Sequence, residues 1–167
     1  MPVHSVMTTN LNLTLAPVSE TPRAGRPVSV LVIYENIPAR IRIQQCCWML
    51  MRELSREFNF ECSWYGFDDL KHPRVAMRAR AAAANADVIL FSVSVDTELP
   101  PAVRTWVESW IRYKTDQDTA LAALLNKPNS ARKRSSIWEY LSEIARRAGM
   151  SFLPEIVAPR HLCARAA

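Results

Sequence analysis

Residues 88–95 read VILFSVSV, and this run of apolar and β-branched side chains decides the fold class. A strand that is apolar on both faces is typical of the inside of a covered parallel sheet. An acidic loop, residues 96–99, follows it, and Pro100 and Pro101 mark the start of a helix. Ligands of such sheets bind at the carboxyl ends of the strands, so we expect a functional site at residues 94–98.

The rest of the chain alternates strand and helix patterns in the same way. We predict strands at 28–34, 60–64, 88–95, 119–125 and 150–153, and helices at about 39–58, 73–86, 101–113 and 135–149. Together they form one α/β domain, residues 28–158, between a flexible N-terminal tail, residues 1–27, and a C-terminal tail, residues 159–167.

The strand patterns also predict the order of the sheet. The strands at 28–34 and 88–95 are apolar on both faces and should be central. The strand at 60–64 alternates apolar and polar side chains, and Pro154 limits the pairing of the strand at 150–153, so both should be edges. These constraints favour the order 2-1-3-4-5, a doubly wound, three-layer sandwich of the flavodoxin-like type.

Composition narrows the class of protein. The chain has 167 residues, of which 49% are hydrophobic and 22% charged, as in a globular domain. Its longest apolar run, residues 120–125, is too short to cross a membrane, and the first residues lack the pattern of a secretory signal. The four cysteines have no metal-ligand spacing, so we expect reduced thiols in a cytoplasmic protein.

The net charge of +5 lies in the last third of the chain. Its densest part is a predicted loop with Lys127, Arg132, Lys133 and Arg134. Clustered cations can bind phosphates, but this loop has neither interleaved aromatic residues nor a nucleic-acid-binding motif. A solvated loop is the better interpretation, and nucleic acid is not expected as a partner.

The predicted strand order brings the ends of strands one and three together, and with them a set of polar residues. The candidate ligand-binding residues are Glu35, Asn36, Arg40, Ser94, Asp96, Thr97 and Glu98. Glu35 and Asp96 are the nearest plausible carboxylate pair and could hold Mg²⁺, although solvated loop carboxylates are the simpler explanation. No residue is predicted to be catalytic.

Residues 86–91 and 99–108, which read ADVILF and LPPAVRTWVE, resemble the corresponding stretch of NAD(P)H-dependent FMN reductases and flavodoxins. The resemblance implies an FMN-binding reductase or flavodoxin-like protein. Those families hold the FMN phosphate in a Ser/Thr/Gly-rich loop after strand one, at a helix N-terminus. Here residues 34–39 read YENIPA, with a carboxylate, a proline and no glycine, and only Arg40 offers a compensating charge.

The chain is also similar to response-regulator receiver domains. Matching residues 89–93 to the receiver pattern places Ser92 where those domains carry their phosphorylatable Asp, and Ser92 has no carboxylate to accept a phosphoryl group. The resemblance therefore implies a pseudo-receiver, which keeps the fold and an interaction face without phosphotransfer.

Taken together, these patterns favour a non-catalytic regulatory or interaction domain with a degenerate ligand site and no cofactor. A protein partner or a homodimer is expected, and the FMN-dependent reductase is the alternative. The helix at 101–113 carries its apolar residues at helical spacing, so Trp106 and Trp110 should lie in the core rather than in a site.

Overall fold

The computed structural model describes residues 26–94, 98–114, 118–126 and 136–153. Its elements, in chain order, are β1 (Val28–Tyr34), α1 (Ile37–Leu54), β2 (Phe60–Gly66), the 3-10 turn η1 (Asp69–Lys71), α2 (Pro73–Asn85), β3 (Val88–Ser94), α3 (Pro101–Ile111), β4 (Ala120–Asn126), α4 (Ser136–Arg147) and β5 (Ser151–Leu153). The two predicted tails lie almost entirely outside the described residues, so their flexibility stays a prediction.

All five strands are parallel and form one sheet in the order β2-β1-β3-β4-β5. This confirms the predicted order, with β2 and β5 at the edges. The central strands β1 and β3 are buried over most of their length because both faces of the sheet are covered there.

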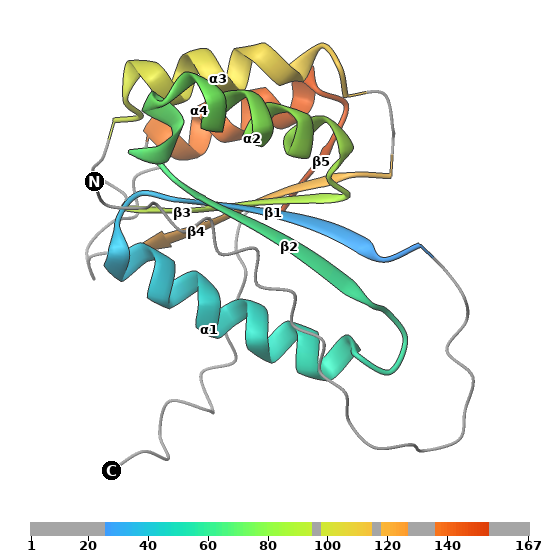
Figure 1. The fold of residues 1–167 in the computed structure, drawn as a ribbon. Helices are drawn as coiled ribbons and strands as arrows, with labels where there is room; N and C mark the ends of the chain where they lie inside the picture. Colours follow the sequence, from blue (N-terminus) through green and yellow to red (C-terminus); the bar gives the residue numbers. More distant parts are fainter. Residues whose placement is uncertain (1–25, 95–97, 115–117, 127–135, 154–167) are drawn as a thin grey trace.

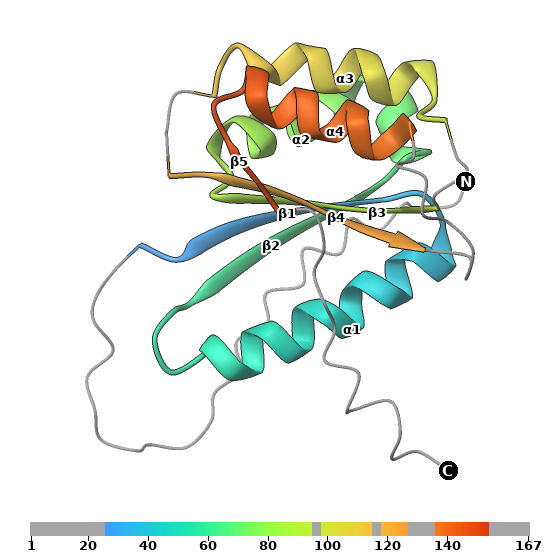
Figure 2. The same ribbon diagram turned by 180° about the vertical axis from the view of Figure 1, so that it is seen from behind.

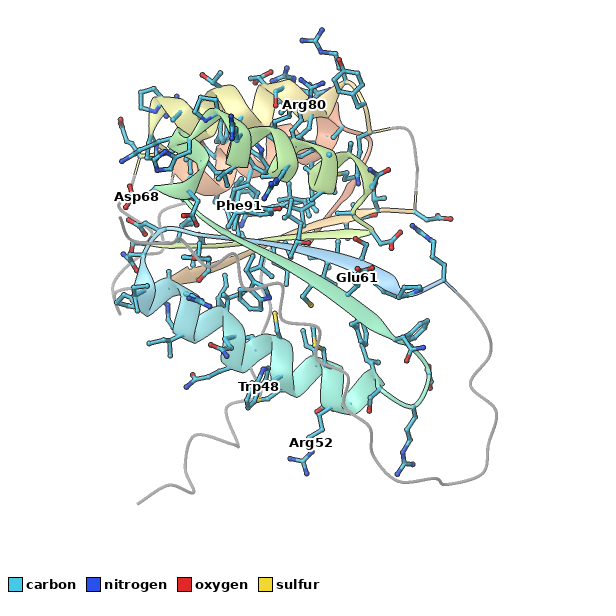
Figure 3. The ribbon with its side chains drawn as sticks, in the orientation of Figure 1. Trp48, Arg52, Glu61, Asp68, Arg80 and Phe91 are labelled. Atoms are coloured by element: carbon cyan, nitrogen blue, oxygen red, sulfur yellow. The ribbon has the colours of Figure 1, made fainter. Side chains whose placement is uncertain are left out.

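The helices are divided unequally between the two faces. Figures 1 and 2 show α2, α3 and α4 together on one face, while α1 lies alone on the other. The larger core therefore lies between the sheet and the group of three helices, and Phe91 of β3 points into it (Figure 3). No helix among the described residues is long and apolar enough to cross a membrane.

The helix α3 anchors the larger core through its apolar stripe. Trp106 and Trp110 are buried side by side, with ring centroids 5.9 Å apart. Their predicted place in the core is confirmed. Aromatic residues four positions apart lie on the same side of a helix, which brings both rings onto the sheet.

The bounds of α1 differ from the prediction of 39–58. The helix begins two residues earlier, at Ile37, and ends at Leu54. Ile43 and Cys47 are buried as the spacing indicates, but Leu50 and Leu54, on the same spacing, are each 40% exposed. The reason is tertiary: the end of α1 lies under the edge strand β2 (Figures 1 and 2), where the sheet offers less surface to cover it.

The smaller core, between α1 and the sheet, contains two of the cysteines. Cys46, Cys47 and Cys62 are free thiols, and Cys163 lies outside the described residues. Cys47 of α1 packs in the same cluster as Cys62 of β2. Burial raises the pKa of Cys47 to about 12, with a smaller contribution from Cys62, and raises that of Cys62 to about 11.

Candidate functional site

The switch point of the sheet lies between β1 and β3, since the chain crosses from β1 to β2 on one side and continues from β3 to β4 on the other. Glu35 follows β1, and its Oε2 accepts a hydrogen bond of 2.7 Å from the backbone N–H of Ser94, the last residue of β3. The backbone N–H of Glu35 in turn donates to the carbonyl of Ser92 at 3.0 Å. The Glu35 side chain therefore bridges the carboxyl ends of β1 and β3, where sheets of this topology have their ligand crevice.

The N-terminus of α1 opens beside this crevice. Asn36 is its N-cap, and its Oδ1 accepts a hydrogen bond of 2.9 Å from the N–H of Ala39. Pro38 has no N–H, and the N–H of Arg40 is used by the carbonyl of Asn36. Of the four N–H positions at this helix start, the Ala39 N–H is capped and Pro38 has none, so those of Asn36 and Ile37 remain for an anion.

A third group of residues fills the β2 side of the crevice. The Arg40 guanidinium lies 5.7 Å from the ring centroid of Tyr34. Burial raises the pKa of Tyr34, the Asp69 carboxylate raises it further, and Arg40 opposes both. Asp69 accepts a hydrogen bond of 2.8 Å from the N–H of Gly66, where an added Cβ would come within 2.9 Å of Tyr34 Cε2. Only glycine allows the ring to lie this close.

Ser92 lies below the crevice rather than in it. Its side chain is fully buried and donates a hydrogen bond of 2.8 Å to the carbonyl oxygen of Ala39 in α1. The hydroxyl thus points into the α1 layer and joins the helix to β3. Position 92, which the resemblance to receiver domains would align with a phosphorylated Asp, is therefore closed to solvent.

The remaining predicted residues do not join this cluster in the described part of the chain. Asp96 and Thr97 lie outside the described residues, so a Glu35/Asp96 pair for Mg²⁺ stays a hypothesis. Within the described ranges there is no group of three or more His, Cys, Asp or Glu side chains that could hold a metal ion. The basic residues Lys127, Arg132, Lys133 and Arg134 are likewise outside the described part.

Glu98 lines a hollow at the N-termini of α3 and α4 that the sequence did not indicate. Arg104 and Tyr140 line it as well, and it has room for about one water molecule. The Arg104 guanidinium lies 5.4 Å from the Tyr140 ring centroid. Burial raises the pKa of Tyr140. No local sequence pattern could have indicated that Arg104 and Tyr140 would meet, because they lie on different helices.

Comparison with known proteins shows which solved structures share the fold of this chain. No protein-family model and no curated protein matches the sequence. Among solved structures, a flavodoxin from Streptococcus pneumoniae TIGR4 aligns over 75% of this chain and 79% of its own, with a TM-score of 0.51 and 9% identity. An oxidoreductase from Corynebacterium diphtheriae aligns over 77% and 80%, with a TM-score of 0.53 and 12% identity.

The strand order and the aligned solved structures indicate the same fold. The chain has a flavodoxin-like fold. A flavo di-iron protein mutant from Thermotoga maritima aligns with 78% of this flavodoxin-like domain, at a TM-score of 0.51 and 12% identity, but with only 30% of its own chain. Identities this low relate the backbones alone, and function has to be argued from the site.

Proposed function

We propose that this flavodoxin-like domain is a non-catalytic regulatory or interaction domain whose ligand site is degenerate. The observation that carries the proposal is the hydrogen bond from the Ser94 N–H to the Glu35 carboxylate. It places a negative charge of the chain itself at the switch point, where a ligand of this fold would bind. An incoming phosphate would meet that carboxylate and would have to displace it.

FMN does not fit the residues present. Its phosphate would need free N–H groups at the start of α1, where the fold offers a positive helix end. Asn36 caps the Ala39 N–H there, and Pro38 lacks a donor. Arg40, the nearby cation, faces the Tyr34 ring at 5.7 Å. Two of the four N–H positions at this helix start are thus lost, and the Glu35 carboxylate lies beside them at the switch point, so these residues do not make the donor-rich cradle that a phosphate needs and we derive no chemistry through FMN.

The outer surface of α1 supports an interaction role. Ile37, Ile41 and Trp48 lie on one stripe of the helix and are 60%, 50% and 59% exposed. Arg52, further along α1, points away from the sheet (Figure 3). Clustered exposed apolar side chains are typical of surfaces that contact another protein. A second copy of the chain or a different protein could occupy this stripe.

The proposal is tested by flavin retention. Purified protein is mixed with excess FMN, desalted and scanned by visible absorbance, alongside Glu35→Gln and the control Glu53→Gln, which changes an exposed carboxylate of α1. We expect no retained flavin in any of the three. Stoichiometric flavin absorbance in the unmodified protein would refute the proposal and support the FMN-dependent alternative.

The interaction role is tested by sedimentation of the unmodified chain and Trp48→Ser, with Met77→Ser as the control. Met77 is 66% exposed but lies on α2, on the opposite face of the sheet. We expect loss of self-association, or of binding to a purified partner, in the Trp48 variant only. If the unmodified chain and both variants sediment and bind alike, the α1 stripe no longer supports an interaction role.

A further inference from the structure

The outer surface of α2 and the end of α3 carry a cluster of positive charge. Arg74, Arg78 and Arg80 of α2 are exposed, and so is Arg112, the C-cap of α3. None of these arginines forms an ion pair within the described part of the chain. Together with Tyr113, which is 48% exposed, they are here called the arginine band. Figure 3 shows Arg80 on the side of the helix layer away from the sheet.

The acidic residues on and around these two helices do not neutralise the arginine band. Helix α2 contains none. Just before it, Asp68 pairs with Lys71 at 2.6 Å, and Asp69 accepts a hydrogen bond from a backbone N–H at the end of β2. Glu108, the one acidic residue of α3, accepts two hydrogen bonds of 2.7 Å from Arg147 of α4. The positive potential over α2 is therefore available to a partner.

Two of the guanidinium groups are held in place by a shared aromatic ring. The Arg80 guanidinium lies 5.0 Å from the ring centroid of Tyr113, and the Arg112 guanidinium lies 5.7 Å from it. Lys114, the next residue, donates hydrogen bonds from its Nζ to two backbone carbonyls at the end of α2. These contacts fix the end of α3 against α2. A positioned guanidinium loses less conformational entropy when it binds a ligand.

The unpaired cations stop at α3. The sheet order places α3 between α2 and α4, and both arginines at the end of α4 are already paired, Arg146 with Glu143 and Arg147 with Glu108. The arginine band is thus a local surface and not part of a continuous basic groove, which a nucleic-acid backbone would follow. The Tyr113 ring also carries two guanidinium groups, so it is not a free platform for stacking a base.

We propose that the arginine band binds an acidic segment of a partner protein, rich in Asp or Glu side chains. The planar fork of a guanidinium matches the two oxygens of a carboxylate and can bind both at once. Arginine and tyrosine are also enriched in protein–protein interfaces, where lysine is depleted. The arginine band lies on a different face from the α1 stripe and does not include the switch point (Figure 1). The inference therefore goes beyond the proposed function and does not rest on flavin retention or on the α1 stripe.

Binding is tested on the full chain by fluorescence anisotropy with a labelled oligoglutamate peptide. The test variant is Arg80→Gln/Arg112→Gln. The matched control is Arg52→Gln/Arg56→Gln, which removes the same charge from exposed positions at and just after the end of α1, on the opposite face of the sheet. We expect the test variant to bind the peptide about tenfold more weakly, since two carboxylate pairs of several-fold each are lost. The control should bind like the unmodified chain.

A second variant separates the guanidinium geometry from charge alone. Arg80→Lys/Arg112→Lys keeps both positive charges but loses the planar forks, so its binding should stay about fivefold weaker than that of the unmodified chain. Full recovery in the lysine variant would overturn the proposal, because any cation would then suffice. So would an equal loss in the Arg52/Arg56 control, or no binding of the peptide by the unmodified chain.

The other occupants of the arginine band are outcomes of the same experiment. Tighter binding of an oligothymidylate of equal charge than of the peptide would overturn the proposal in favour of a nucleic acid. Self-association that Arg80→Gln/Arg112→Gln abolishes in sedimentation would overturn it in favour of a second copy of the chain. We expect the peptide to bind more tightly than the oligothymidylate, and both the unmodified chain and the variant to sediment alike.

Discussion

Replacing Ser92 by Asp should destabilise the domain in a pH-dependent way. The Ser92 side chain is fully buried and faces the carbonyl oxygen of Ala39, 2.8 Å from its hydroxyl. A carboxylate there would be out of water and opposite another acceptor. Both effects disfavour the charged form and raise the pKa of the new Asp, by about 3 units or more at such sites.

The magnitude follows from linkage. An Asp with a pKa near 3.9 when unfolded and about 7 when folded loses about 4 kcal/mol of folding free energy at pH 7. The folded state binds the extra proton between these two values, so stability falls as the pH rises through that window. Near pH 4 the protonated carboxyl can donate to the Ala39 carbonyl, as the serine hydroxyl does. Most of the stability should therefore return there.

The assay is urea unfolding at pH 4 and pH 7 of Ser92→Asp, Ser92→Asn and Ser92→Ala. The Asn variant has the same shape without the charge, and its cost should not change with pH. The Ala variant loses one neutral hydrogen bond and should cost about 1 kcal/mol. Equal destabilisation of the Asp and Asn variants at pH 7 would refute the reasoning, because it would mean that water reaches position 92.

Four further predictions concern the packing around the switch point and α1. Gly66→Ala should cost about 1–3 kcal/mol in thermal or urea unfolding, since its Cβ would meet the Tyr34 ring at 2.9 Å; a neutral change would contradict this contact. Asn36→Ala should cost about 1 kcal/mol and Asn36→Asp much less, because Asp keeps the cap, and equal losses would argue against it. At pH 8 the thiols of Cys47 and Cys62 should react with a thiol reagent far more slowly in the folded than in the unfolded protein, since a raised pKa keeps them protonated. The same raised pKa values should make stability fall above about pH 9, where the unfolded thiols ionise first, and flat stability up to pH 11 would contradict the burial.

The strands and their order could be predicted because they depend on local composition. Residues 88–94 are apolar on both faces, and residues 60–64 alternate, so their central and edge positions follow from which faces must leave water. The predicted end of α1 was wrong because it depends on tertiary packing rather than on local composition. Leu50 and Leu54 keep the helical spacing of a buried face, but spacing cannot reveal where the sheet above them ends.

The candidate site, like the fold, could be predicted from the sequence only in part. The sequence indicated that Glu35 and Ser94 would meet, because the strand order alone brings the ends of β1 and β3 together. It could not indicate that the Glu35 carboxylate would be used by the Ser94 N–H, or that Asn36 would cap α1 instead of facing a ligand. Those outcomes depend on side-chain directions, which are set by packing against neighbouring elements.

The sequence by itself therefore determined the fold class, the strand order and the meeting of Glu35 with Ser94 at the switch point. These follow from hydrophobic periodicity and turn residues, which act over a few positions along the chain. Only the tertiary structure decided that Ser92 is buried against α1, that the crevice is bridged from within, and that Arg104 and Tyr140 meet. Contacts between distant segments depend on how whole elements pack, and no short window of sequence contains that information.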